Sequence, residues 1–249
     1  MRILITNDDG INARGLHFLA GVSRRVGDVH VVAPDREQSG ASHSLTLHRP
    51  LRLTHRDDGA YHVDGTPTDC VLLALGVLLR ERPDFVLSGV NHGPNMGEDV
   101  LYSGTVAAAM EGLSLGIPGV AVSLAGGDID LLETQEEWLE RLVTRIVNVS
   151  DFPEETLLNV NLPPIPGDEI RGIRTTTLGN RVYSESLVET SDPWGRTVYW
   201  IGGGQASWSG REDCDFRMVQ EGYISVTPLH LDLTNYRLLE DVRGWNLGD

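Results

Sequence analysis

The segment MRILITNDDGINARGLHFLAGVSRRVGDVHVVAPDREQSG, residues 1–40, contains the pattern that decides the fold. Residues 2–6 are a short apolar run typical of a buried strand, residues 15–26 have helical periodicity, and residues 29–33 form a second strand-like run. A strand, a helix and a strand in this order predict a crossover unit with two parallel strands in one sheet. Polar residues follow each strand directly.

The same alternation continues along the chain of 249 residues. Further strands are expected at residues 85–88, 120–123 and 157–160. Further helices are expected at residues 67–79, 104–115 and 131–147. The pattern predicts an α/β fold: a three-layer sandwich in which helices cover both faces of a mostly parallel sheet.

Two stretches depart from this rhythm. Residues 47–62 are expected to form a local antiparallel excursion around an Asp57-Asp58-Gly59 turn. Residues 167–204 lack helical periodicity, and residues 191–195 provide a turn between two polar strands. This predicts an exposed hairpin that either packs on another subunit or is a solvated flap. Its aromatic residues are Tyr183, Trp194, Tyr199 and Trp200.

Composition and charge exclude several classes of function. The net charge is −16, which disfavours general binding to nucleic acid polymers or anionic membranes. All 20 cationic side chains are arginine, and the absence of lysine excludes a P-loop lysine, a Schiff base and any phosphatase that needs lysine to hold phosphate.

The compartment is expected to be the cytoplasm. No apolar run approaches the ~18 residues of a membrane-spanning helix, and residues 1–3 lead directly into a strand, which leaves no room for a signal peptide. Cys70 and Cys214 have no paired spacing, so we expect reduced thiols and not a disulfide framework or zinc site.

Oxygen-rich segments follow three of the predicted strands, where ligands bind in open parallel sheets. They are residues 7–10, residues 34–40 and residues 89–95. The adjacent carboxylates of Asp8 and Asp9 would repel each other unless a cation lies between them, and oxygen ligands suit Mg²⁺ or Mn²⁺. In the alternative interpretation Asp8 caps a helix and Asp9 is a turn residue. Ser39 and Asn91 at neighbouring strand ends favour the metal site.

A second element is the start of the helix predicted at residues 104–115. Ser103, Gly104 and Thr105 precede a run of alanines, so the first turn presents free backbone N–H groups that suit an anion. In the alternative interpretation, the same residues form an ordinary serine N-cap on an alanine-rich helix. The preceding loop carries Asn91 and Asn95 and would hold this helix start beside the metal. A cation next to such a helix start fits a phosphate monoester.

Other motifs in the chain would indicate other functions, but their sequence context argues against them. The G-x-S-x-G pattern at residues 112–116 lies between a predicted helix and a strand, the reverse of a nucleophile elbow. No G-x-G-x-x-G follows the first strand, which argues against nicotinamide binding. His43 and His92 could donate a proton to a leaving alkoxide, although loop histidines are more often simply solvated.

With these residues in view, the sequence resembles the SurE family, stationary-phase survival proteins that act as metal-dependent 5'/3'-nucleotidases. The resemblance covers nearly the whole chain, and residues 167–215 match least clearly. The motifs that carry it are ILITNDDG (3–10), DREQSG (35–40), VDGTP (63–67), SGVN (88–91), YSGT (102–105), NVNLP (159–163) and SVTPL (225–229).

The resemblance implies a Rossmann-like core, a protruding hairpin and a C-terminal segment exchanged within a homodimer or homotetramer. Residues 1–165 are then the catalytic core, and residues 166–249 supply the hairpin, a closing strand and the oligomerisation segment of the same structural unit. It also implies one divalent ion per subunit. The implied ion ligands are Asp8, Asp9, Ser39 and Asn91. The residues implied near the phosphate are Asn95, Ser103, Gly104 and Thr105.

The expected function is hydrolysis of nucleoside 5'/3'-monophosphates by metal-activated water, with Asp8 as proton acceptor. Asp8 could instead be the attacking nucleophile, and the sequence leaves both roles open. A protein that senses nucleotide or phosphate without hydrolysing it would carry nearly the same residues. A metal-independent acid phosphatase is a further alternative.

Overall fold

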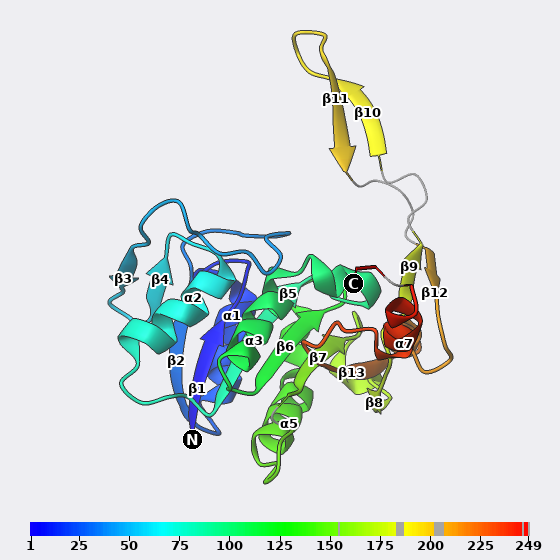
Figure 1. Cartoon of the computed structure of the whole chain (residues 1–249). Helices are drawn as coiled ribbons and strands as arrows, with labels where there is room; N and C mark the ends of the chain where they lie inside the picture. The colour runs from blue at the N-terminus through cyan, green and yellow to red at the C-terminus, as the bar shows by residue number, and fades with distance from the viewer. Residues whose placement is uncertain (154, 183–186, 202–206, 246, 249) are drawn as a thin grey trace.

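A nine-stranded sheet forms the centre of the molecule, in the order β3-β4-β2-β1-β5-β6-β7-β13-β8 (Figure 1). The structure is a computed structural model that describes residues 1–153, 155–182, 187–201, 207–245 and 247–248. The five central strands run parallel, and they are β1 (Arg2–Thr6), β2 (Asp28–Pro34), β5 (Phe85–His92), β6 (Gly119–Leu124) and β7 (Leu157–Leu162).

The edges of the sheet mix both directions. On one side, β4 (Tyr61–Val63) pairs parallel with β2, and β3 (Leu53–His55) pairs antiparallel with β4. On the other side, β13 (Tyr223–Leu229) pairs antiparallel with β7, and β8 (Gly172–Thr175) pairs parallel with β13. The mostly parallel α/β fold predicted from the sequence is therefore confirmed. The proposed division at residue 165 stays a prediction. The residues after it supply β8 and β13 to the same sheet as the residues before it.

Helices cover both faces of the sheet because successive strand residues point to opposite sides. On one face, Ile3 and Ile5 of β1 pack with α1 (Arg14–Ser23) and α5 (Glu136–Val147). On the other face, Leu4 packs in a cluster with Cys70 and Ala108, which belong to α2 (Pro67–Leu73) and α3 (Gly104–Ser114). Both cysteines are free thiols in the structure, and both are buried.

Two predicted helices are interrupted. The helix expected at residues 67–79 ends as an α-helix at Leu73 and continues as a π-helical turn, η1 (Ala74–Leu78), where the N–H of Leu79 donates to the carbonyl of Ala74. Gly76 lies in this turn and weakens the α-helical alternative. Apolar spacing alone does not distinguish the two helix types.

The helix expected at residues 131–147 divides into α4 (Leu131–Thr134) and α5 at Gln135. The buried side-chain amide of Gln135 donates to the carbonyls of Pro163 (2.8 Å) and Ile165 (2.6 Å). The chain also crosses Thr134 closely at Gly167, where a Cβ atom would lie 1.9 Å from the Thr134 carbonyl oxygen. A contact with a distant segment therefore breaks the helix.

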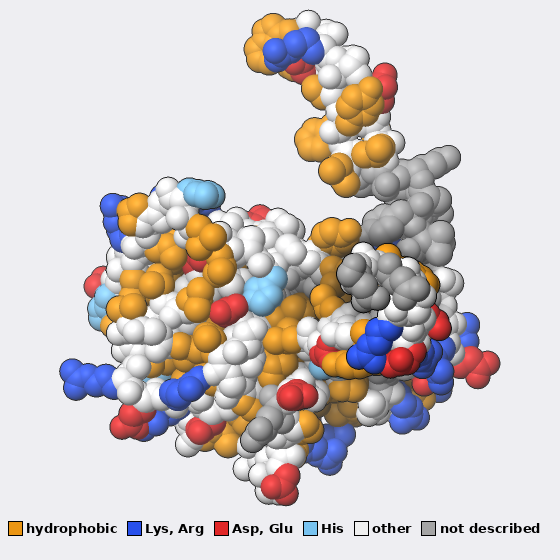
Figure 2. Space-filling view, viewed as in Figure 1, with side chains coloured by type: hydrophobic (Ala, Val, Ile, Leu, Met, Phe, Trp, Pro, Cys, Tyr) orange, Lys and Arg blue, Asp and Glu red, His pale blue; other side chains and the backbone are white. Residues whose placement is uncertain are grey.

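The predicted hairpin is present and extends away from the sheet (Figure 1). It pairs β10 (Leu187–Ser191) with β11 (Thr197–Ile201) antiparallel, and Asp192 accepts hydrogen bonds from the N–H groups of Trp194 and Arg196 in the turn. Trp194, Tyr199 and Trp200 are exposed, and Figure 2 shows hydrophobic side chains along its length. Tyr183 lies outside the described residues.

Shorter elements complete the described chain. β9 (Asn180–Val182) pairs with β12 (Ser207–Ser209), and α6 (Asp215–Gln220) precedes β13. The remaining helical turns are η2 (Gly97–Leu101), η3 (Gly167–Glu169), η4 (Tyr236–Leu238) and α7 (Leu239–Arg243). Within the described part of the chain, we find no helix with the length and apolar character needed to cross a membrane.

Candidate active site

Three neighbouring strands bring the predicted site residues to one edge of the sheet. β2, β1 and β5 are adjacent and parallel, so their carboxyl ends lie side by side. A cavity of about 360 Å³ lies at this edge, and Asp9, Ser39 and His92 all line it. Two of the four predicted ion ligands therefore share one cavity. Glu37, which the sequence reasoning did not single out, lines it as well.

Asp8 does not line this cavity and lies against the start of α3. It is buried, and its Oδ1 accepts a hydrogen bond from the hydroxyl of Thr105. A Cβ atom at Gly104 would lie only 2.8 Å from Cβ of Asp8, so this close approach requires glycine. The backbone N–H of Gln38 donates to the Asp8 carbonyl (2.7 Å), which ties the segment carrying Ser39 to the same point.

The protein environment raises the pKa of both aspartates. Burial raises the pKa of Asp8 from its ordinary 3.8 to about 6, and the charge of Asp9 adds to this, while the Thr105 hydroxyl opposes it. Burial and the charge of Glu37 raise the pKa of Asp9, against the hydrogen bond from the His92 N–H (3.1 Å). A cation between the two carboxylates would relieve this cost of ionisation.

Asn91 and Ser39 present oxygen atoms that suit such a cation. The side-chain nitrogen of Asn91 donates to the carbonyl of Gly93 (2.9 Å), which leaves the side-chain oxygen as the atom available to an ion. The hydroxyl of Ser39 donates to Glu37 (2.8 Å) and keeps its lone pairs. Within the described residues no group of three or more His, Cys, Asp or Glu side chains is arranged to hold a metal. The predicted set of two carboxylates, one hydroxyl and one amide is of a different kind and fits Mg²⁺ or Mn²⁺.

The start of α3 is compatible with both interpretations of its sequence, an ordinary serine N-cap and an anion-binding helix start. Ser103 is the N-cap, since its hydroxyl accepts a hydrogen bond from the N–H of Val106 (3.0 Å). The first-turn N–H groups adjoin Asp8, because Gly104 is packed against that side chain. Thr105 directs both its hydroxyl and its backbone N–H to Asp8, and both hydrogen bonds lower the pKa of that carboxylate.

Asn95 is buried in a network of polar side chains from two strands. Its side-chain nitrogen donates to the hydroxyl of Ser123 (2.8 Å). Its backbone carbonyl accepts from the side-chain amides of Asn159 (2.7 Å) and Asn161 (2.9 Å). Asn161 also accepts from the Asn95 N–H (2.9 Å). The sequence reasoning missed these supporting residues, although two asparagines on one face of the buried strand β7 were a usable signal.

The two candidate histidines both have hydrogen-bond partners. A ring nitrogen of His43 lies 2.8 Å from the carboxylate of Glu111 on α3, and a ring nitrogen of His92 lies 3.0 Å from the carbonyl of Gly127. His92 lines the cavity and His43 does not. Of the two, His92 is therefore the one placed to act on a ligand there.

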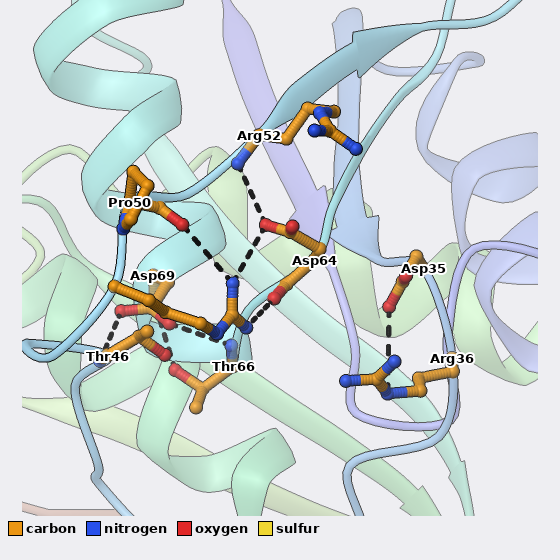
Figure 3. A network of polar contacts seen from close by, with 9 residues as sticks. Asp35, Arg36, Thr46, Pro50, Arg52, Asp64, Thr66 and Asp69 are labelled. Carbon is orange, nitrogen blue, oxygen red and sulfur yellow. Dashed lines mark hydrogen bonds and ion pairs between the residues drawn. The ribbon is translucent and has the colours of Figure 1, made fainter.

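The segment that carries Ser39 is anchored to the start of α2 (Figure 3). Thr66 caps that helix in a capping box with Asp69, and Pro67 occupies its first turn, as expected from the sequence. The Asp69 carboxylate accepts from the N–H groups of Thr46 (3.0 Å) and Thr66 (2.9 Å), which lie on either side of it in Figure 3. Asp35, at the start of the segment, lies 4.0 Å from Arg36 in an ion pair. The backbone N–H of Asp35 donates to the carbonyl of Val63 (2.8 Å), so the chain is held where it leaves β2 and again near Thr46.

Comparison with known proteins agrees with this geometry. The family model described as Survival protein SurE matches residues 3–185 of the chain. The chain belongs to the SurE family. The resemblance inferred from the sequence motifs is thereby confirmed.

Relatives of the SurE family match over almost the full length. A Gemmatimonas aurantiaca protein named 5'-nucleotidase SurE is 60% identical over 248 residues, which cover 98% of each chain. A Geobacter metallireducens protein of the same name is 49% identical and covers 100% of this chain and 99% of its own. The crystal structure of the Sure protein from Aquifex aeolicus superposes with a TM-score of 0.86 at 42% identity, over 99% of this chain and 100% of that one.

Proposed function

We propose that this SurE-family nucleotidase hydrolyses nucleoside 5'- or 3'-monophosphates to nucleoside and phosphate, using one bound Mg²⁺ or Mn²⁺. Its relatives carry the name 5'-nucleotidase over their full length. The observation that carries the proposal is the meeting of Asp9 and Ser39 in one cavity, with Asp8 packed against the start of α3.

The proposed ligands of the ion are Asp8, Asp9, Ser39 and Asn91. They come from the ends of β1, β2 and β5, which lie next to one another. When bound, the divalent ion would polarise a phosphoryl oxygen and lower the pKa of a coordinated water. The raised pKa values of Asp8 and Asp9 support the assignment, because both carboxylates gain from a neighbouring positive charge.

The chain's own groups bind the phosphate and move the proton. The start of α3, formed by Ser103, Gly104 and Thr105, would bind the phosphate: the N–H groups of Ser103 and Gly104 would stabilise phosphoryl oxygens while Thr105 holds Asp8 beside them. The fixed Asn95 amide would add a donor. Asp8 accepts the proton of the attacking water. The Thr105 hydroxyl binds Oδ1 and so orients the carboxylate that receives the proton.

The proposed assembly is a homodimer or homotetramer in the cytoplasm, with neither membranes nor nucleic acid polymers as partners. The β10–β11 hairpin and the C-terminal segment are the proposed assembly elements. Both expose large apolar side chains, including Trp200 and Ile201 on the hairpin and Leu233, Tyr236 and Leu247 near the C-terminus. Exposed apolar surface of this kind is usual at protein interfaces.

Phosphate release from AMP tests the function directly. The assay uses the protein with Mn²⁺ and then with excess chelator. We expect release with Mn²⁺ and none with chelator. A nucleotide sensor would bind AMP without releasing phosphate, and a metal-independent acid phosphatase would ignore the chelator; either result contradicts the proposal.

A further inference from the structure

A second cavity, of about 370 Å³, lies at the same edge of the sheet as the candidate active site. Pro94 and Met96, the residues on either side of Asn95, both line it. Ala125 and Pro164 line it as well, and they follow the ends of β6 and β7. The cavity is therefore next to the residue assigned to the phosphate, beyond the ends of β6 and β7.

A thin wall separates the two cavities. His92 lines the first, and its ring nitrogen lies 3.0 Å from the carbonyl of Gly127. A Cβ atom at Gly127 would lie 3.2 Å from Cβ of Pro164, which lines the second. The two cavities are thus close neighbours, with His92, Gly127 and Pro164 between them.

The lining of the second cavity is mostly apolar and aromatic, with three polar side chains. The rings of Trp208 and Phe216 stack with centroids 5.5 Å apart and an interplanar angle of 21°. Met96, Ile165 and Val219 add aliphatic surface. Polar groups come from Asp99, Arg181 and Gln220, and the Arg181 guanidinium lies 5.6 Å from the Trp208 ring.

A buried carboxylate holds together the chain segments around this cavity. Asp215 accepts hydrogen bonds from the N–H groups of Gly97 (2.8 Å), Gly179 (2.9 Å) and Phe216 (2.7 Å). These three bonds join the segment after Asn95, the segment before β9 and the helix α6. The aromatic pair is therefore held in a defined position relative to Asn95.

This chemistry matches a planar heterocycle with polar edges. An apolar, aromatic lining disfavours a sugar or a phosphate, whereas nucleobases stack on aromatic side chains and bond through their edges. We propose that the cavity lined by Met96, Trp208 and Phe216 binds the nucleobase of the substrate while its phosphate occupies the start of α3. The inference rests on the proposed nucleotidase function and adds the part of the molecule that selects a nucleotide over other phosphate esters.

Selectivity between AMP and ribose 5-phosphate tests the base site. The two substrates share a phosphate and a ribose and differ in the base. In the wild type, kcat/KM should be higher for AMP. Trp208→Leu removes the stacking surface, and Ala125→Leu fills the cavity. Each should lower the ratio of kcat/KM for AMP to that for ribose 5-phosphate on the order of ten-fold.

A matched control is Trp194→Leu at the exposed tip of the hairpin, which also loses a tryptophan and should keep the wild-type ratio. The base site is overturned if the folded Trp208→Leu and Ala125→Leu proteins keep that ratio too. If the wild type hydrolyses neither substrate, the nucleotidase function is wrong, and adenosine binding in chelator decides the base site alone. Weaker adenosine binding in Ala125→Leu than in the wild type then supports it, and equal or absent binding overturns it.

Discussion

The hydroxyl of Thr105 donates a hydrogen bond to the carboxylate of Asp8, although 97 residues separate them in the sequence. This bond joins the two halves of the candidate site, the strand end that carries the carboxylates and the helix start that we propose binds the phosphate. It also opposes the effect of burial on the pKa of Asp8. The position of the proposed proton acceptor thus depends on a residue in the first turn of α3, the turn proposed to bind the phosphate.

Replacing Thr105 with valine keeps the shape of the side chain and removes this bond. The pKa of Asp8 should rise, since a hydrogen bond to the ionised form is lost. We expect the acid limb of the pH profile of kcat/KM to move to higher pH and kcat to fall on the order of ten-fold. Thr105→Ser, which retains the hydroxyl, should restore the profile. An unchanged acid limb in the valine variant would contradict the role of the bond.

Replacing Gly104 with alanine should damage the site while helping the helix. The new Cβ would lie 2.8 Å from Cβ of Asp8 and 3.0 Å from its Oδ2, so the carboxylate or the helix start must shift. We expect at least roughly ten-fold lower kcat/KM for AMP from a displacement of this size. Gly21→Ala in α1 is the matched control, because nothing lies within 4 Å of a Cβ there. It should raise stability by about 0.5–1 kcal/mol and leave activity unchanged. Equal activity of the two variants would refute this account of Gly104.

The raised pKa of Asp8 gives a signed dependence of stability on pH. Between its ordinary 3.8 and about 6, the folded protein without an ion binds more protons at this group than the unfolded chain does. The contribution of Asp8 to the free energy of unfolding should therefore fall as pH rises through this window. Denaturant titrations in chelator from pH 4 to 7 measure this contribution as the free energy of unfolding of the wild type minus that of Asp8→Asn. We expect this difference to fall as pH rises, and a difference that rises would contradict the prediction.

The three hydrogen bonds of Asp215 should make it important for stability. Asparagine at this position can no longer accept at one of the two oxygens, which leaves a buried N–H group without its partner. We expect the free energy of unfolding to fall on the order of 1–3 kcal/mol in Asp215→Asn. Asp213→Asn, an exposed acidic residue two positions earlier, should change it much less. Urea denaturation measures both, and equal losses would argue against the buried role.

Local sequence signals predicted the starts of several elements well. Thr66, Pro67 and Asp69 fixed the start of α2, and Ser103 fixed the start of α3, because caps act within one turn of the chain. The rule that ligands bind at the carboxyl ends of parallel strands brought Asp9 and Ser39 to the same predicted site, although β1 and β2 are separated by a helix.

The features that the sequence did not predict depend on contacts between distant segments. The break at Gln135 follows from bonds to Pro163 and Ile165, and the support of Asn95 follows from asparagines on β7. Neither leaves a periodic signal. The bond from Thr105 to Asp8 is of the same kind, because it exists only once α3 has packed against the end of β1.

The central claim is that Asp8, Asp9, Ser39 and Asn91 hold one divalent ion beside the start of α3. A crystal of the protein soaked in Mn²⁺ and measured at the manganese absorption edge tests it most directly. The account predicts a single strong anomalous peak within coordinating distance of oxygens from all four side chains. A peak that excludes Asp9, Ser39 or Asn91, or no peak at the ends of β1, β2 and β5, would contradict it.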